Sequence, residues 1–401
     1  MIKKLGCSII LAFGFIVLAG HNTFGGIRGP EHRTLRPLAM GNAFVALVDD
    51  KDALHYNPAG LNLMGSLGNK KRRPEMGYYP SDYVDMHMNF LGAGIPFGTA
   101  MNLLNIYQDH ETALQGGLEG LQDDTTLVSD LVVFDREPIL FALLTGGELA
   151  FHNFGMSYWG DVRVAPFLDV GVVLPQAGLE LIQVDVCGEI GISRSFFRDR
   201  LAIGVEYRMA VREQIKNVQI GVGDIAEINT IIQDTIDNHA KGLTDFGRIG
   251  HGMDIGFLWQ QTRSIRLGGA IQNLFMTLNH QKVTPKLTLG VACSPRVLQN
   301  NFRWKRKINF ALDVEDVLND ENGYKFLSKV NMGAEWEQVL IPYILKGRLS
   351  VGAKGGYLTA GLGGNLFTVL HYEFATWAEE GGYYTGQKED RYYVMNFGIG
   401  F

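Results

Sequence analysis

Several segments of this chain alternate between bulky apolar residues and small or polar residues over long distances. From Leu201 to Arg212 the sequence LAIGVEYRMAVR places apolar side chains at every odd position and glycine, alanine, glutamate or arginine at every even one. Successive side chains of an extended strand point to opposite faces, so one face is apolar and the other carries charges. The same alternation recurs at 182–193 and 307–316. These segments predict β-strands with one fully apolar face.

The length of these strands distinguishes a soluble sheet from a membrane barrel. Strands of a soluble sandwich average about 5–6 residues, whereas these run for about 9–13, the length with which a tilted strand crosses a bilayer. In a membrane barrel the apolar face meets lipid, the charged face lines the lumen, and closure pairs every edge. The predicted fold is all-β, a transmembrane antiparallel β-barrel of about 14 strands. The predicted strands are 84–95, 149–159, 161–173, 179–194, 201–212, 251–262, 265–277, 286–297, 306–318, 325–337, 347–354, 357–363, 366–377 and 391–401.

The connections between these strands differ in length on the two sides of the membrane. With both chain ends on the periplasmic side, that side receives short turns, and the long connections lie outside, as is typical of such barrels. Two insertions, 96–148 and 213–250, are predicted to form helical extracellular loops. Their helices either catch a hydrophobic ligand or pack on each other above the barrel. The proposed hydrophobic capture helix has one apolar face at three- and four-residue spacing: Val222, Ile225, Ile228, Ile232 and Ile236.

The first residues predict export. Lys3 and Lys4 precede an apolar run of about 14 residues, too short for a membrane helix of ~20 residues but typical of a signal peptide, which we expect at 1–25. The expected location is a bacterial outer membrane, in contact with its lipid. Outside this segment the chain has Cys187 and Cys293, whose strand positions place them on opposite faces. This argues against a disulfide scaffold and against a cysteine-based zinc site.

Other functional classes lack support in the sequence. The formal net charge is −6, which gives no basic surface for nucleic acid. The chain has no phosphate-binding loop, no nucleophile-elbow motif and no zinc-protease motif. His55 and His371 are near segments of interest, and His371 is expected to form a lumenal polar pair with Glu373. We therefore expect no catalytic residue, no cofactor, no metal site and no enzymatic activity.

The chain ends in RYYVMNFGIGF, an alternating strand that finishes on an aromatic residue. This ending resembles the recognition signal of outer-membrane barrels. The resemblance implies that the barrel assembly machinery is a partner of this chain. The residues assigned to the assembly signal are Tyr393, Phe397 and Phe401.

The segment before the first strand contains RPLAMGNAFVALVDDKDALHYNPAGL at 36–61. We expect a helix at AMGNAFVA and a tight turn at NPAG, because Pro58 restricts Asn57 to an extended backbone and Gly60 permits a positive φ. These motifs, with the C-terminal block from Arg348, resemble the long-chain fatty acid transporter family (FadL) and its relatives, such as PorV of type IX secretion and TraF-like outer-membrane proteins. The resemblance is strong over 27–65 and 345–401. Between these ranges only the predicted architecture is similar.

The resemblance implies an N-terminal hatch at 26–83 inside a barrel formed by 84–401. It also implies a lumen that admits fatty-acid-like molecules when the hatch moves; a docking role in protein export or surface assembly, as for PorV, is the alternative. The residues assigned to the hatch and its gating are Asp49, Asp50, Asn57, Pro58, Ala59 and Gly60, although NPAG could be only a structural turn. The lumen-lining residues are Arg163, Glu206, Arg208, Arg212, Asp313 and Arg348, of which we expect an arginine to pair with Asp49 or Asp50.

Overall fold

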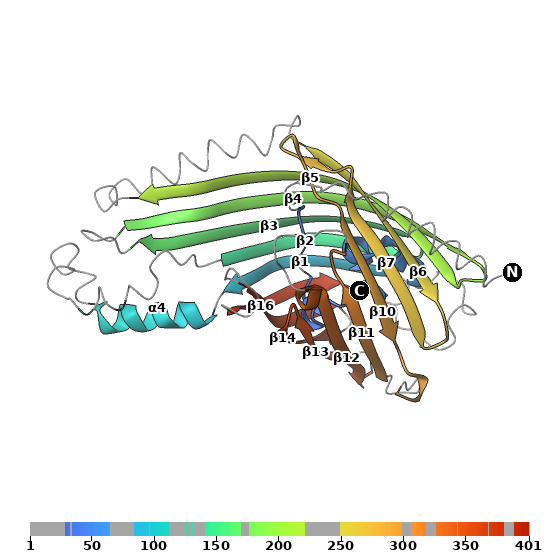
Figure 1. The fold of residues 1–401 in the computed structure, drawn as a ribbon. Coiled ribbons are helices and arrows are strands. Elements are labelled where there is room, and N and C mark those ends of the chain that lie inside the picture. The colour runs from blue at the N-terminus through green and yellow to red at the C-terminus, as the bar shows by residue number, and fades with distance from the viewer. Residues whose placement is uncertain are drawn as a thin grey trace.

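In a computed structural model of the chain, fourteen antiparallel strands of the described residues form one closed barrel (Figure 1). Each strand pairs with its neighbours in the barrel, and β1 closes the barrel by pairing with β16. The predicted fold class and strand number are confirmed. The structure describes residues 29–32, 34–64, 84–95, 97–111, 126, 130, 141–169, 176–220, 249–298, 306–317, 326–342, 344–367, 369–380 and 389–400.

The barrel strands follow one another round the wall almost in chain order, since only a small hairpin interrupts them between β7 and β10. This hairpin consists of β8 (Thr277–Leu278) and β9 (Gln281–Lys282). Short 3-10 turns lie at Arg296–Leu298 and Phe326–Lys329. The barrel strands are β1 (Val84–Ile95), β2 (Phe141–Phe151), β3 (Phe154–Asp169), β4 (Gln176–Phe196), β5 (Leu201–Ile220), β6 (Gly250–Gln260), β7 (Ile265–Leu274), β10 (Lys286–Cys293), β11 (Arg306–Val314), β12 (Val330–Ile341), β13 (Leu345–Lys354), β14 (Tyr357–Leu366), β15 (Leu370–Glu380) and β16 (Glu389–Gly400).

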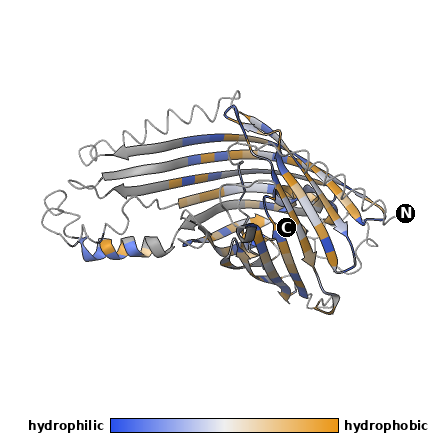
Figure 2. Ribbon diagram, viewed as in Figure 1, coloured by the Kyte–Doolittle hydropathy of each residue, from blue (hydrophilic) through white to orange (hydrophobic). Residues whose placement is uncertain are grey.

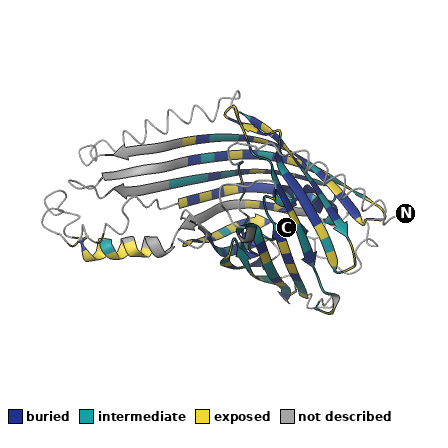
Figure 3. Ribbon diagram, in the orientation of Figure 1, coloured by how far each residue is buried: buried dark blue, intermediate teal, exposed yellow. Residues whose placement is uncertain are grey.

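The two faces of each strand differ as the alternation predicts. On β4, Val186 and Ile190 are exposed on the outer face, whereas Cys187 and Glu189 are buried inside. Figures 2 and 3 show the corresponding alternation of hydropathy and of burial along the strands. Because charged side chains point inward and apolar ones outward, the wall has the polarity of a membrane barrel. Among the helices in the described residues, none is long and apolar enough to span a membrane.

Several predicted strand boundaries differ from the structure, and two of these differences change where the insertions begin and end. The predicted strand 149–159 is split by a turn at His152 and Asn153, so β2 occupies part of the predicted insertion 96–148. Asn153 adopts a positive φ of 68°, which asparagine tolerates better than most residues. Likewise β5 continues to Ile220, within the predicted insertion 213–250, because its ladder with β4 continues after the sequence alternation has ended.

The N-terminal segment lies inside the barrel, and we call its residues 34–64 the plug. It contains α2 (Leu35–Ala39), α3 (Ala53–Tyr56) and the 3-10 helix η1 (Pro58–Leu63). Its apolar side chains are almost completely buried and pack against small wall residues, including Ala202 and Ala311. The hydrophobic core of the protein is therefore centred on the plug within the lumen. The largest plug side chains of this cluster are Met40, Phe44, Leu47, Leu54 and Leu61.

The local structure of the plug differs from the sequence prediction in two places. AMGNAFVA is not a helix, because α2 ends at Ala39 and both Gly41 and Asn42 have positive φ angles, of 67° and 64°. Gly60 does not have a positive φ: it lies within η1, where a Cβ would be 2.6 Å from Val48 Cγ2. The NPAG stretch is thus the start of a 3-10 helix, and Gly60 is needed for space.

One predicted outer helix is present in the described residues. It is α4 (Phe97–Asp109), which lies past the ends of β1 and β16 on the side to which β3, β4 and β5 project (Figure 1). Met101, Leu104 and Tyr107 of α4 are exposed. The proposed capture helix, with Val222, Ile225, Ile228, Ile232 and Ile236, is outside the described residues.

Candidate functional site: the contact between plug and barrel wall

Asn57 joins the start of η1 to both the plug and the wall. It is fully buried, and its Nδ2 donates hydrogen bonds to the carbonyl oxygens of Val45 (2.8 Å) and Phe257 (3.0 Å). Its Oδ1 accepts a hydrogen bond from the amide of Ala59 at 3.1 Å and so caps the 3-10 helix. Pro58 occupies the first helical position, where its missing N–H costs little. Both N–H donors and the oxygen of the Asn57 side chain therefore take part in holding this turn against β6 and the rest of the plug.

Wall glycines allow the plug backbone to approach the strands very closely. A Cβ on Gly204 of β5 would be 2.3 Å from the Ala59 nitrogen, and one on Gly256 of β6 would be 1.9 Å from Asn57 Oδ1. On the opposite side of the plug, a Cβ on Gly333 of β12 would be 2.2 Å from the Met40 carbonyl oxygen. Any side chain at these positions would displace the plug. We call the contact of residues 57–60 with Gly204 and Gly256 the seat.

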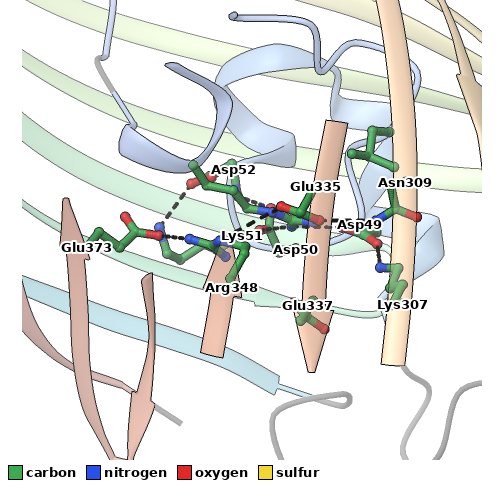
Figure 4. A network of polar contacts seen from close by, with 12 residues as sticks. Asp49, Asp50, Lys51, Asp52, Lys307, Asn309, Glu335, Glu337, Arg348 and Glu373 are labelled. Carbon is green, nitrogen blue, oxygen red and sulfur yellow. Dashed lines mark hydrogen bonds and ion pairs between the residues drawn. The ribbon is translucent and has the colours of Figure 1, made fainter. Parts of the chain in front are cut away.

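A buried arginine links the plug to β12. Arg36 donates through Nε and Nη2 to both carboxylate oxygens of Glu335, each at 2.7 Å, and through Nη1 to Asp49 at 2.8 Å and to Asp50. Asp49 also pairs with Lys307 of β11, and Asn309 donates to Glu335 (Figure 4). We call this group of Arg36, Asp49, Asp50, Lys307 and Glu335 the Arg36 anchor.

Charge compensation keeps the anchor ionised. Burial alone would raise the pKa of Asp49, but Lys307 and Arg36 outweigh it and hold that pKa well below its ordinary value. The two-pronged contact of Arg36 with Glu335 is the geometry that a guanidinium favours with a carboxylate. The anchor therefore fixes one side of the plug through charges that have little access to water.

The four lumenal arginines of the sequence prediction bind carboxylates of the wall. Arg163 pairs with Asp161, Arg212 with Asp185, and Arg348 with Glu373. Arg208 pairs with Glu189, Glu206 and Asp254, all on the barrel wall. Asp49 and Asp50 bind Arg36, a cation of the plug that the sequence prediction did not consider. All four arginines and Glu206 nevertheless point into the lumen, as expected.

Asp313 was expected to line the lumen, but it binds the backbone of the plug. Its Oδ2 accepts hydrogen bonds from the backbone amides of Phe44 and Val45, at 2.6 and 2.8 Å. These two amides follow the positive-φ turn at Gly41 and Asn42. Asp313 thus holds the backbone of the plug, which its alternation in the sequence could not indicate.

A second charged contact lies between the plug and strands β2 and β4. His55 Nε2 is 3.1 Å from Glu148 Oε1, and His55 Nδ1 is 2.8 Å from Glu189 Oε2. Lys51 Nζ binds the other Glu148 oxygen at 2.6 Å. Burial opposes protonation of His55, but the carboxylates of Glu189 and Glu148 outweigh it and raise its pKa to about 10. We call His32, Lys51, His55, Glu148 and Glu189 the histidine anchor.

Sequence reasoning singled out only His55 of this anchor. Glu148 was placed in an extracellular insertion, although it lies on β2. Glu189 was recognised only as a polar position of an alternating strand. A second histidine of interest, His371, forms the expected polar pair with Glu373, with 3.2 Å between Nε2 and Oε1.

The remaining space between plug and wall is small. A cavity of about 60 Å³ is lined mainly by polar and charged residues, among them His32, His55, Tyr56, Lys286 and Asp313. It can hold a few water molecules but not a fatty acid. The plug fills the lumen at this level.

Comparison with protein-family models and with curated proteins finds no match. Solved structures of membrane channels align with most of the chain. The toluene transporter TodX of Pseudomonas putida is 9% identical, with a TM-score of 0.42, over 93% of this chain and 98% of TodX. The toluene transporter TbuX of Ralstonia pickettii is 13% identical, with a TM-score of 0.44, over 92% and 97%. The monoaromatic hydrocarbon channel CymD is 10% identical, with a TM-score of 0.38, over 94% and 97%.

The architecture itself agrees with the FadL resemblance. The resemblance implies a barrel with an N-terminal segment in its lumen, and both are present here: a closed fourteen-stranded barrel in the described residues, and a plug buried within it. This agreement rests on strand pairing and burial. It does not depend on the aligned structures.

Two groups of predicted site residues remain to be placed. Tyr393 and Phe397 of β16 are exposed on the outer face of the barrel, on the same side of the strand. Phe401 and the five residues of the proposed capture helix are outside the described residues.

Proposed function

We propose that this protein is an outer-membrane channel that admits small hydrophobic molecules and that the plug closes its lumen. The observation that carries this proposal is a closed membrane barrel whose lumen is filled by a separate segment held by noncovalent contacts. Cys187 and Cys293 are free cysteines, so neither forms a disulfide that would hold the plug in place. A segment held in this way can move without breaking the strand ladders, which close on themselves.

The hydrophobic character of the substrate rests on two features. The plug motif AMGNAFVA followed by NPAGL resembles that of the fatty acid transporters. In addition, Met101, Leu104 and Tyr107 expose apolar surface on α4, past the ends of β1 and β16. Apolar side chains at the outer mouth can collect hydrophobic molecules from water, which favours this substrate class.

A disulfide that locks the plug tests the proposal. A Cβ on Gly155 of β3 would be 2.8 Å from Leu61 Cδ2. Replacing both Gly155 and Leu61 by cysteine, in a chain with Cys187→Ala and Cys293→Ala, places the two sulfur atoms in the space that the Leu61 side chain fills. The oxidised and reduced forms of one purified protein are then compared in proteoliposomes loaded with labelled long-chain fatty acid or toluene.

We expect the reduced protein to pass the hydrophobic probe and the oxidised protein to pass much less. The cysteine-free parent, treated with the same oxidant, is the matched control and should be unaffected. Equal flux through the oxidised and reduced forms would show that plug movement does not gate the lumen. Flux of neither probe above that of protein-free vesicles would remove the transport proposal.

A docking role in protein export or surface assembly is the alternative, and strand length favours it. β4 and β5 have 21 and 20 residues, although a membrane crossing needs about 9–11. With β3 they project past most of the other strands toward α4 (Figure 1). Deleting 177–181 together with 216–220 would shorten this projection. Loss of a co-purifying partner protein with unchanged uptake of the hydrophobic probe would favour docking.

A further inference from the structure

His55 of the plug and His32, which precedes the plug in the chain, face one carboxylate oxygen of the barrel wall. His32 Nε2 and His55 Nε2 are 3.2 and 3.1 Å from Glu148 Oε1. One ligand atom from each of the three residues lies within 4.8 Å of those from the other two. Two imidazole nitrogens and one carboxylate oxygen form a ligand set that Zn²⁺ uses when a fourth position is left for water. Small shifts of the two rings would bring all three atoms to coordination distance from a single ion.

The surroundings of these atoms resemble the outer shell of a metal site. His55 Nδ1 contacts Glu189 Oε2 at 2.8 Å, which orients the ring and leaves Nε2 facing the other ligands. Glu189 is itself fixed by Ser157 Oγ at 2.7 Å and Trp159 Nε1 at 3.1 Å. Lys51 binds Glu148 Oε2, so that Oε1 is the oxygen left for the histidines.

The charge balance also favours a cation. Within the described part of the chain, the ion pairs that join these groups contain five carboxylates and two permanent cations, Lys51 and Arg208. Excess buried negative charge is costly unless a cation compensates it. The protonated His55 supplies one further positive charge, and a divalent ion bound to neutral histidines would supply two in its place. The carboxylates are Asp52, Glu148, Glu189, Glu206 and Asp254.

An open side is present for the fourth ligand. His32 and His55 line the cavity of about 60 Å³, which is large enough for a water molecule. The His32 ring is also held in place, since it stacks on Trp159 with 5.1 Å between ring centroids. Its Nδ1 is buried and has no hydrogen-bond partner within the described part of the chain.

We propose that His32, His55 and Glu148 bind one Zn²⁺ ion that joins the plug to β2. His55 belongs to the plug, His32 precedes it in the same N-terminal segment, and Glu148 belongs to the wall, so the complete site exists only while the plug is seated. A ligand that binds one state stabilises that state. Zinc therefore holds the plug closed, whichever molecule the barrel admits.

Metal titration tests the site directly. The full barrel, purified in detergent through an affinity tag without histidine and stripped with a chelator, is titrated with Zn²⁺ and assayed for retained metal by elemental analysis. We expect one zinc per chain, and loss of this stoichiometric binding in His32→Gln, His55→Gln and Glu148→Gln. Glu189→Gln, which keeps all three ligands, should weaken binding by about 10–100-fold.

His371→Gln provides the matched control. His371 is a buried lumenal histidine beside a glutamate and another histidine ring, with 4.1 Å between the His87 and His371 centroids, but Glu373 is bound there by Arg348. This variant should keep one zinc per chain. Absence of stoichiometric zinc in the wild type, or equal zinc in the wild type and His32→Gln, would overturn the proposal.

The rate of hydrogen exchange at the plug amides, measured with and without zinc, distinguishes a metal site from a set of ion pairs. Zinc should slow exchange across 34–64 in the wild type, and chelator should reverse this effect. Substituting His32 should abolish the response to zinc while the strands remain protected. If wild-type exchange is the same with and without zinc, the histidines only pair with the carboxylates, and the proposal fails.

Discussion

The seat and the Arg36 anchor hold the same plug by different physical means. At the seat, the plug backbone lies against Gly204 and Gly256, and the contact depends on the absence of side-chain volume. At the anchor, Arg36 is surrounded by Glu335, Asp49 and Asp50, and the contact depends on charge balance. The first should therefore be sensitive to added atoms and the second to a lost charge. Substitutions of each kind can test this division.

Arg36→Met should have the largest effect on the plug. It keeps much of the side-chain length but removes the two-pronged partner of buried Glu335 and leaves Asp49 with Lys307 alone. Breaking one partner of a buried ion pair typically costs ~3–5 kcal/mol. We expect the plug to leave its position while the barrel remains folded. The measurement is thiol labelling of Thr34→Cys, a buried reporter position, in a chain with Cys187→Ala and Cys293→Ala.

Arg391→Met is the control for the lost charge. Arg391 also pairs with a glutamate, Glu389, but on an exposed part of the wall. Exposed pairs contribute about 0–1 kcal/mol, so Thr34→Cys should stay protected in this variant. If Arg36→Met is equally protected, the anchor is not what holds this side of the plug.

Gly204→Val should have the next largest effect, through volume alone. Its Cβ would lie 2.3 Å from backbone atoms of Pro58 and Ala59, which cannot move aside as a flexible side chain could. Overpacking typically costs ~1–3 kcal/mol, and a clash with backbone belongs at the upper end. We expect higher conductance in a planar bilayer, with the barrel still heat-modifiable on a gel.

Gly188→Val separates this effect from a general loss of glycine. Gly188 lies on β4, where a Cβ would meet no atom within 4 Å. The Gly188→Val protein should insert into the membrane and keep its lumen closed, like the wild type. Leakage through both variants would mean that valine disturbs the strands themselves, and the seat would lose its special role.

The sequence predicted what depends on local periodicity and missed what depends on distant partners. Alternation was enough to assign the inner and outer faces, because the side chains of a single strand point alternately to the two faces. Arg36 and Glu335 are 299 residues apart, so nothing local could reveal their contact. The plug also changes the environment of the inner face: alternation assigns Ala202 and Asn309 to a face that lines a wet lumen, yet both are buried.

Asn57→Ala should weaken the seat less than the added volume at Gly204. It removes the cap on Ala59 N and the two hydrogen bonds to Val45 and Phe257, and unsatisfied buried groups cost about 1–3 kcal/mol. We expect faster hydrogen exchange at 57–63 with little change around Arg36. Uniform acceleration across the plug would show that seat and anchor act as one cooperative unit.

Pro58→Ala should have the smallest effect, and it decides what the NPAG stretch contributes. Alanine can adopt the helical φ that proline holds here, so the loss comes mainly from greater freedom of the unfolded segment, worth about 0.4–1 kcal/mol. Asn57 keeps its hydrogen bonds and Gly204 keeps its close contact, so the channel should remain closed in bilayer recordings.

Gly60→Val instead adds volume to the same stretch, since its Cβ would be 2.6 Å from Val48 Cγ2 and 2.9 Å from Ala53 Cβ. If Pro58→Ala leaks as much as Gly60→Val, backbone stiffness closes the lumen. If only Gly60→Val leaks, the stretch acts through its fit to its neighbours, and the plug is held closed by packing and charge together.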